Sequence, residues 1–224
     1  MLAYYSICIF MYRGEYLLYN YLKQRRVHLY ILGLVIMTLG IALSIQAQLG
    51  TSPFDAVLVG LYRTFGLTIG SWEIVVGGSM ILCNALLVRK RPELFAILTS
   101  LITGIGIDSW LALIRHFIYP TSIIGQWITM IISFLLIGLG VSIYLLSFVA
   151  PNPIDRSMVI LSDITGLSMT YTRAIISIIL VIIALFFNGA VGVGTLINAL
   201  FVGYIITLCL PLVEKLFIKE SVYD

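Results

Sequence analysis

Six long apolar stretches run along the chain, separated by short polar or glycine-containing segments. A helix needs about 20 mainly apolar residues to cross the hydrocarbon core of a bilayer. The stretches that qualify are 29–49, 69–88, 94–115, 124–149, 171–188 and 193–214. The longest uncharged run, 174–213, is interrupted by Asn188-Gly189 and by Gly192 and Gly194, which predict a turn between the last two helices. The pattern therefore predicts an all-α membrane protein with six transmembrane helices.

Two shorter segments, 52–65 and 152–165, have the start and stop signals of helices. Each opens with an N-cap residue before a proline at the first helical position, carries an aspartate in its first turn and ends at a glycine. These residues are Ser52, Pro53, Asp55 and Gly66 in the first segment, and Asn152, Pro153, Asp155 and Gly166 in the second. A helix of about 13 residues is roughly 20 Å long, against about 30 Å of hydrocarbon. We therefore expect two re-entrant or interfacial half-helices.

The second half of the chain repeats the first at a shift of 100 residues. Gly40 falls on Gly140, Pro53 on Pro153, Asp55 on Asp155, and Gly66-Leu67 on Gly166-Leu167. Matches at Pro, Asp and Gly with constant spacing are informative even in so apolar a chain, and they indicate an internal repeat. Repeat one covers 29–116 and repeat two 124–217, each as span, half-helix, span, span. Because three is odd, we expect the repeats to be inverted about a pseudo-two-fold axis in the membrane plane.

The basic residues predict the orientation. Cytoplasmic loops of membrane proteins carry an excess of Lys and Arg. With the N-terminus inside, the cytoplasmic side receives eleven of the thirteen basic residues: Arg13, Lys23, Arg25, Arg26, Arg89, Lys90, Arg91, Arg156, Arg173, Lys215 and Lys219. Arg63 and Arg115 lie outside. We expect a multi-pass protein of the cell (inner or plasma) membrane with both termini cytoplasmic.

The domain organisation follows from these elements. We predict a cytoplasmic or interfacial, Tyr-rich tail over 1–27, a single membrane domain over 28–217 and a cytoplasmic tail over 218–224. Residues 1–12 are apolar but have neither a leading positive charge nor an A-x-A cleavage site, so no signal peptide is expected.

Composition agrees with membrane residence. Of 224 residues, 61% are hydrophobic and 10% charged, and the mean hydropathy is +1.10. So much apolar surface cannot be buried behind so few charges, which excludes a soluble globular domain and a disordered chain. A net charge of +3 is no nucleic-acid footprint. The three cysteines (Cys8, Cys83, Cys209) and two histidines (His28, His116) form no disulfide framework and no metal-site spacing, so we expect no metal and no cofactor.

Ionisable residues at membrane depth are candidates for binding a substrate or ion. Asp55 and Asp155 either line a central cavity or cap their own half-helices. Asp108 either binds a proton or cation or is a hydrogen-bonded packing residue. Glu73 and Arg173 occupy equivalent places in the repeats, and either pair across the pseudo-axis or extend to their own interfaces.

Three stretches resemble a known family. Residues 50–55 read G-T-S-P-F-D, 66–72 read G-L-T-I-G-S-W, and 194–203 read G-T-L-I-N-A-L-F-V-G. These resemble the G-x-x-P-x-D, G-L-[ST]-x-G-x-W and G-T-x-x-N-A-L-x-x-G motifs of the YczE/YyaS/YitT-type bacterial integral membrane proteins. The resemblance covers nearly all of 30–215 and implies a multi-span protein of the bacterial inner membrane.

Two functions fit the sequence. The first is a small secondary-transporter-like protein with a midplane site between inverted repeats, for which paired discontinuous helices are a sequence pointer. The alternative is a non-transport regulator or assembly partner of another membrane complex. No enzyme motif is present, so we expect no enzyme. The predicted partners are the lipid bilayer, a small solute or ion, and either a second copy of the chain or another membrane protein.

Overall fold

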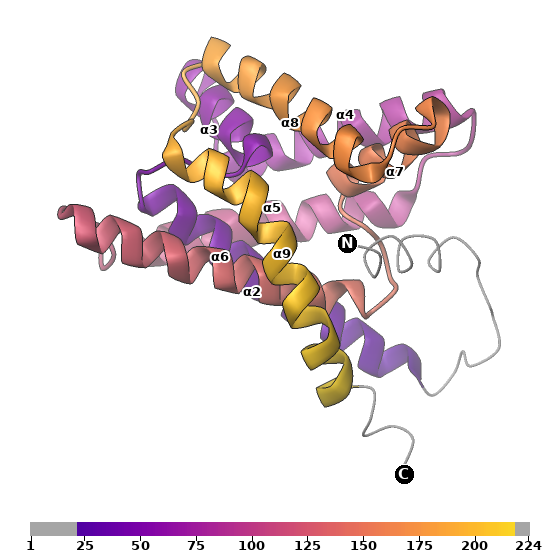
Figure 1. The fold of residues 1–224 in the computed structure, drawn as a ribbon, viewed down its shortest axis with the longest axis horizontal. Helices are drawn as coiled ribbons and strands as arrows, with labels where there is room; N and C mark the ends of the chain where they lie inside the picture. Colours follow the sequence, from indigo (N-terminus) through magenta and orange to yellow (C-terminus); the bar gives the residue numbers. More distant parts are fainter. Residues whose placement is uncertain (1–21, 218–224) are drawn as a thin grey trace.

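The computed structural model describes residues 22–217, which form helices joined by short connections (Figure 1). Residues 1–21 of the predicted N-terminal tail (1–27) and the whole predicted tail over 218–224 lie outside the described residues. Within the described part there are eight helices and no strands: α2 (Leu22–Gln46), α3 (Pro53–Phe65), α4 (Ile69–Val88), α5 (Leu94–Ile114), α6 (Ile123–Leu145), α7 (Pro153–Thr165), α8 (Met169–Phe186) and α9 (Val193–Phe217). The predicted all-α fold is confirmed.

Six of these helices are long and apolar enough to cross a membrane, namely α2, α4, α5, α6, α8 and α9. This confirms the six predicted spans. The boundaries differ at some ends: α2 begins at Leu22, inside the predicted tail, and stops three residues before the predicted end at 49. Helix α6 likewise ends at Leu145 rather than 149. Gln48 (φ 58°) and Phe148 (φ 53°) have left-handed backbone conformations, which a helix cannot continue through.

The two short helices have the predicted caps. The Ser52 Oγ accepts a hydrogen bond from the Asp55 N–H at 3.1 Å, and the Asn152 Oδ1 accepts from the Ile154 N–H at 3.3 Å. Both helices are 13 residues long. They end at Gly66 (φ 78°) and Gly166 (φ 70°), where the missing Cβ permits the left-handed turn. Local sequence therefore sets where both short helices begin and end.

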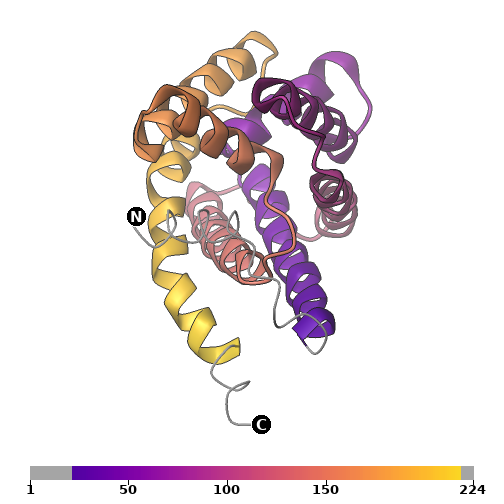
Figure 2. The ribbon, with the colours of Figure 1, turned by 90° about the vertical axis from the view of Figure 1, so that its right-hand side faces the viewer.

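The core of the fold is the crossing of α2 and α6, which lie side by side in Figures 1 and 2. Glycines let the two backbones approach closely. A Cβ on Gly33 would collide with the Tyr144 backbone, and one on Gly140 would collide with the Met37 backbone. Small residues at helix contacts are the usual means of close packing inside membranes. The glycine spacing thus fixes where these helices cross.

The remaining helices pack around this pair. Helix α5 packs on α2, and α9 packs on α6; α4 packs on α5 and α7, while α3 packs on α8. The α4–α5 crossing is also close, because Gly70 and Gly104 face each other's carbonyl groups. Figure 1 shows α3 toward one end of the long helices and α7 toward the other.

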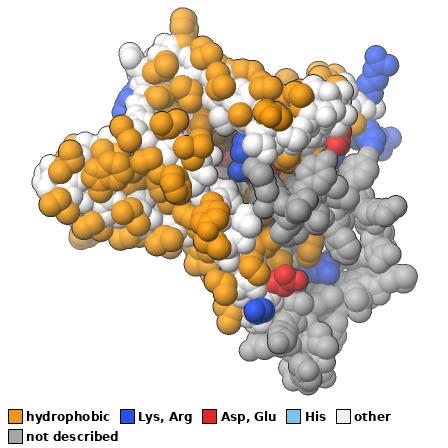
Figure 3. Space-filling model, in the orientation of Figure 1, with side chains coloured by type: hydrophobic (Ala, Val, Ile, Leu, Met, Phe, Trp, Pro, Cys, Tyr) orange, Lys and Arg blue, Asp and Glu red, His pale blue; other side chains and the backbone are white. Residues whose placement is uncertain are grey.

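The outer surface of the long helices is apolar. Hydrophobic side chains cover most of the face in Figure 3, and few charged side chains interrupt them. Exposed large side chains on the spanning helices include Leu86, Phe95, Ile131, Phe186 and Leu208. A continuous apolar surface of this kind is stable against lipid rather than water. The protein is therefore in contact with the lipid bilayer.

Candidate functional site

Two buried carboxylates from different helices interact electrostatically in the interior. Glu73 lies one turn into α4 and is 1% exposed, and Asp55 lies in the first turn of α3 and is 5% exposed. The carboxylate of Asp55 acts electrostatically on that of Glu73. The Glu73 Oε1 is buried and accepts no hydrogen bond from the described residues. Two like charges in a low-dielectric interior repel each other unless a proton or cation is shared between them.

The Asp55 carboxylate is held by its own N-cap. The Ser52 hydroxyl donates to Asp55 Oδ2 at 2.6 Å while its oxygen accepts from the Asp55 N–H. The Asp55 carboxylate is therefore turned toward the start of α3, and the Ser52 hydroxyl bonds both to this carboxylate and to the Asp55 backbone N–H.

Asp155, the equivalent residue of the second half, has a different partner. Its Oδ2 accepts a hydrogen bond from the Tyr144 hydroxyl at 3.0 Å. The residue equivalent to Tyr144 in the first half is Ser44, whose Oγ is buried and makes no hydrogen bond with the described residues. The short serine side chain leaves Asp55 without a tyrosine donor. The two aspartates therefore differ: Asp155 is bonded to Tyr144 of α6, whereas Asp55 is bonded to its own N-cap, Ser52.

Asp108 joins two helices. Its Oδ1 accepts a hydrogen bond from the Gly70 N–H at 2.8 Å, so a side chain on α5 caps the first turn of α4. The first N–H groups of a helix have no partner within the helix and need an external acceptor. Of the two interpretations that the sequence left open, this contact favours the hydrogen-bonded packing residue.

Arg173 packs against α9. Its Nη1 lies where a Cβ on Gly203 of α9 would be, so the guanidinium packs against α9. The Asp55 carboxylate acts electrostatically on Glu73. The contact of Arg173 with α9 does not test the hypothesis that Glu73 and Arg173 pair, which stays a prediction.

Buried hydroxyls on α5 lie opposite the acidic pair. Gly70 packs on Gly104 and Gly77 on Ser100, so residues 100–104 of α5 cover residues 70–77 of α4, the stretch that contains Glu73. The hydroxyls of Ser100 and Thr103 are buried and have no hydrogen-bond partner among the described residues. Buried polar groups of this kind are normally satisfied by water or an ion. Polar groups of both α4 and α5 therefore lie near Glu73.

The start of α7 lies on the same face of α4. The Asn84 Nδ2 donates to the Pro153 carbonyl at 3.4 Å, and the Ser157 hydroxyl donates to Asn84 Oδ1 at 3.0 Å. Pro153 is also the neighbour of Gly77. Four residues separate Gly77 from Glu73, a rise of about 6 Å along a helix. The start of α7 thus packs on the face of α4 that carries Glu73, toward the C-terminal end of that helix.

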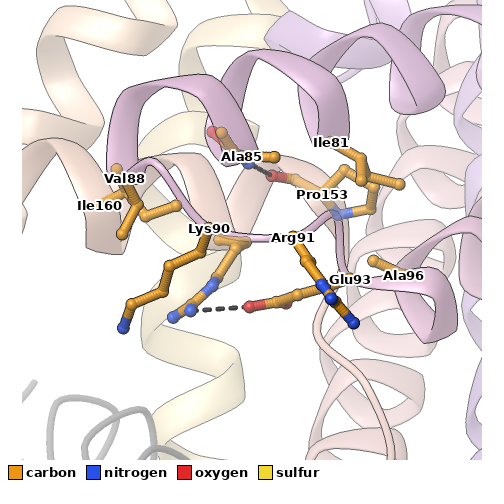
Figure 4. A pocket seen from close by; sticks show the side chains of 11 residues that line it. Ile81, Ala85, Val88, Lys90, Arg91, Glu93, Ala96, Pro153 and Ile160 are labelled. Carbon is orange, nitrogen blue, oxygen red and sulfur yellow. Dashed lines mark hydrogen bonds and ion pairs between the residues drawn. The ribbon is translucent and has the colours of Figure 1, made fainter.

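A cavity of about 80 Å³ lies between the C-terminal part of α4, the α4–α5 loop and the start of α7 (Figure 4). Its inner wall is apolar and reaches Pro153, and its outer rim is charged. The rim carries Lys90, Arg91, Glu93 and Arg156. The Arg156 Nη2 and Glu93 Oε1 form an ion pair at 2.7 Å. None of the residues that line this cavity comes from α3.

At the other end of the molecule the corresponding loops are joined by backbone hydrogen bonds. The Thr51 N–H donates to the Ala190 carbonyl at 3.0 Å, and the Gly194 N–H donates to the Leu49 carbonyl at 2.7 Å. The loop before α3 is therefore closed against the α8–α9 loop, whereas the first turn of α7, with Pro153 and Arg156, borders the cavity.

Among residues 22–217 no three His, Cys, Asp or Glu side chains come together as a metal site. The prediction that the chain binds no metal or cofactor stays a prediction. Sequence reasoning missed the partnership of Asp55 with Glu73, the Glu93–Arg156 ion pair and the cavity. These contacts join residues far apart in the chain, and the only signal was the rarity of charge in so apolar a sequence.

The fold and this interior define a multi-pass α-helical membrane protein that buries an acidic pair among its helices. The comparisons with known proteins agree. Residues 24–211 match a family described as "Family of unknown function (DUF6198)". The chain belongs to this family, which confirms the YczE/YyaS-type resemblance.

Three relatives illustrate the membership. "Uncharacterized protein YyaS" of Bacillus subtilis strain 168 is 41% identical over 192 residues, 86% of this chain and 96% of that protein. "Uncharacterized membrane protein YczE" of the same strain is 31% identical over 185 residues, 81% of this chain and 84% of that protein. An "Uncharacterized protein" of Haemophilus influenzae is 25% identical over 195 residues, 87% of each chain. No solved structure matches the chain.

Proposed function

We propose that this protein is a small secondary transporter that carries a solute across the membrane together with a cation or proton bound by Asp55 and Glu73. The observation that carries the proposal is the Glu73 carboxylate, which is buried in a membrane-crossing helix beside a second acid and has an oxygen without a hydrogen-bond partner in the described residues. Ionisable groups at such positions are costly, and they mark ion pathways in many transporters.

The transporter proposal includes two inverted repeats, and the packing of α2 on α6 supports them. A Cβ on Gly33 would meet the Gly140 carbonyl, and one on Gly40 would meet the Ser133 carbonyl. Gly33 and Ser133, like Gly40 and Gly140, are 100 residues apart. The contact of Gly33 with Gly140 in one direction is thus matched by the contact of Ser133 with Gly40 in the other. A two-fold axis between the halves produces such pairs of contacts.

The backbone supports the same repeat independently of side-chain identity. Residues with positive φ recur in both halves: Gln48 with Phe148 and Gly66 with Gly166 at a shift of 100, and Arg89 with Asn188 at a shift of 99. Packing also exchanges between the halves, since α3 lies on α8 and α4 on α7. One difference is that α4 packs tightly on α5, whereas no comparable contact joins α8 and α9 in the described part of the chain.

We further propose that α3 and α7 are half-helices that enter from opposite faces of the membrane. The contacts of their first residues support this, because the loop before α3 bonds to the α8–α9 loop, while Arg156 in the first turn of α7 pairs with Glu93 of the α4–α5 loop. With three spans in each half, these two loops lie on opposite sides of the bilayer. Paired discontinuous helices of this kind bring helix ends to the transported ion.

A flux assay tests the function. Purified protein is reconstituted in liposomes, and uptake of radioactive Na⁺ and Rb⁺ and movement of H⁺, reported by a trapped pH dye, are measured. We expect the wild-type protein to move at least one of these cations, and Glu73→Gln and Asp55→Asn each to abolish that movement. The matched control is Asp163→Asn, which removes an exposed carboxylate from the end of α7. It should transport at the wild-type rate.

Two results would overturn the proposal. One is cation movement that persists in both variants of the acidic pair. The other is the absence of movement of all three cations in a wild-type preparation that is monodisperse and folded. The second result would favour the alternative function, in which the protein regulates or helps to assemble another membrane complex.

A further inference from the structure

We propose that the cavity between the α4–α5 loop and α7 binds the phosphate group of an anionic phospholipid. Nothing in the proposed transport site depends on it, because Asp55 and Glu73 do not line this cavity. The cavity volume of about 80 Å³ is several times the 10–15 Å³ or so that one ordered water requires, so a group larger than water fits.

The charge at the rim favours an anion. Three basic residues, Lys90, Arg91 and Arg156, line the cavity, against one acidic residue, Glu93, among the described lining residues. In Figure 4 the side chains of Lys90 and Arg91 extend to the same side of the loop as Glu93, whose ion pair with Arg156 is drawn. That ion pair at 2.7 Å holds the guanidinium in place at the rim. Clustered basic groups at a membrane face bind lipid phosphates.

The other wall favours a lipid over a soluble anion. Ile81, Val88 and Ile160 form an apolar wall on the inner side of the same cavity. Beside it, Leu86 and Leu87 of α4 are exposed on the outer surface of the helix. The cavity lies where the α4–α5 loop connects two spanning helices, hence at the level of the lipid headgroups. An occupant with a phosphate above an acyl chain matches both the charged rim and the apolar wall.

The start of α7 adds to the attraction. The cavity reaches Pro153, the first residue of that helix, and Arg156 projects from its first turn. The positive end of a helix dipole favours a negative group near its N-terminus. The rim charges, the apolar wall and the helix end therefore point to the same class of ligand.

Binding is measured on purified protein in detergent by native mass spectrometry and by thermal unfolding, with added phosphatidylglycerol, phosphatidylcholine, glycerol 3-phosphate or inorganic phosphate. We expect phosphatidylglycerol to bind and to raise the melting temperature, and phosphatidylcholine to do neither. Each basic group near an anionic surface strengthens binding about fivefold, so Lys90→Gln with Arg91→Gln should weaken phosphatidylglycerol binding about 25-fold. Glu93→Gln, which removes the acid from the rim, should strengthen it.

Arg89→Gln is the matched control, because Arg89 is a neighbouring exposed basic residue that does not line the cavity. It should bind phosphatidylglycerol as the wild-type protein does. Equal losses in Arg89→Gln and in the double variant would overturn the site, as would equal binding of phosphatidylcholine and phosphatidylglycerol by the wild-type protein. If glycerol 3-phosphate or inorganic phosphate binds as tightly as the lipid, and loses its binding in the double variant, the phosphate site stands but the lipid as its occupant is overturned.

Discussion

The Asp108 side chain on α5 caps the first turn of α4 by accepting a hydrogen bond from the Gly70 N–H at 2.8 Å. The same two residues lie at the closest approach of the helices, where Gly70 and Gly104 leave no room for a Cβ. The beginning of the helix that carries Glu73 is therefore fixed by a residue from another span.

This cap can be tested by substitution. Asp108→Ala removes the acceptor and leaves a backbone donor unsatisfied, which should lower the free energy of unfolding by about 1–3 kcal/mol. Asp108→Asn keeps an oxygen acceptor and should cost less than half as much. Thermal unfolding in detergent, followed by tryptophan fluorescence, measures both. Equal losses in the two variants would mean that the charge, rather than the cap, is what matters at this position.

The close crossing of α2 and α6 predicts that a side chain added at the contact lowers stability. A Cβ on Gly140 would collide with the Met37 backbone, so Gly140→Ala should lower the free energy of unfolding by about 1–3 kcal/mol, the usual cost of overpacking. Gly78→Ala is the matched control, because a Cβ at Gly78 meets nothing within 4 Å and alanine favours helix more than glycine. Melting temperatures in one detergent compare the two. A stable Gly140→Ala protein would show that the helices are further apart than described.

The bond between Tyr144 and Asp155 predicts a modest effect. Tyr144→Phe removes the hydroxyl that donates to the Asp155 carboxylate at 3.0 Å, and should cost about 1 kcal/mol of stability. Transport should continue, since this bond lies outside the acidic pair. Tyr204→Phe, at a side chain that is 62% exposed, is the control and should change stability by less than about 0.5 kcal/mol. A loss of flux in Tyr144→Phe at full stability would place Asp155 in the transport pathway.

The inverted arrangement predicts the sidedness of equivalent residues. Arg63 and Asp163 are 100 residues apart and both are exposed near the ends of the short helices. In a background with Cys8, Cys83 and Cys209 replaced by alanine, we expect Arg63→Cys to react with an impermeant maleimide from outside intact cells. Asp163→Cys should react only after permeabilisation. Labelling of both from one side would rule out inversion.

Much of the architecture was readable from local sequence. The pairs Ser52-Pro53 and Asn152-Pro153 marked the first residues of α3 and α7 because a capping oxygen and a fixed proline φ act within one turn. Gly66 and Gly166 ended them for the same local reason. Span ends were less well predicted, because apolar character continues past the last hydrogen-bonded turn. The left-handed backbones at Gln48 and Phe148, which mark those ends, have no sequence signature.

The candidate site was only half readable. Asp55, Glu73 and Asp108 stood out because charge is rare in apolar helices, but their roles depended on which residue of another helix lay opposite. The place of Glu73 in the repeat predicts Arg173 as its partner, and its electrostatic interaction with Asp55 has no counterpart in the sequence pattern.

The sequence by itself determined the six spans, the two short helices, their caps and the repeat, because each depends on hydrophobicity or on hydrogen bonds between near neighbours in the chain. Only the tertiary structure decided which carboxylates meet, which polar groups stay without a partner and where a charged cavity opens. Those outcomes depend on close contacts between glycine-lined helix faces, and the spacing of residues along one chain does not specify which faces come together.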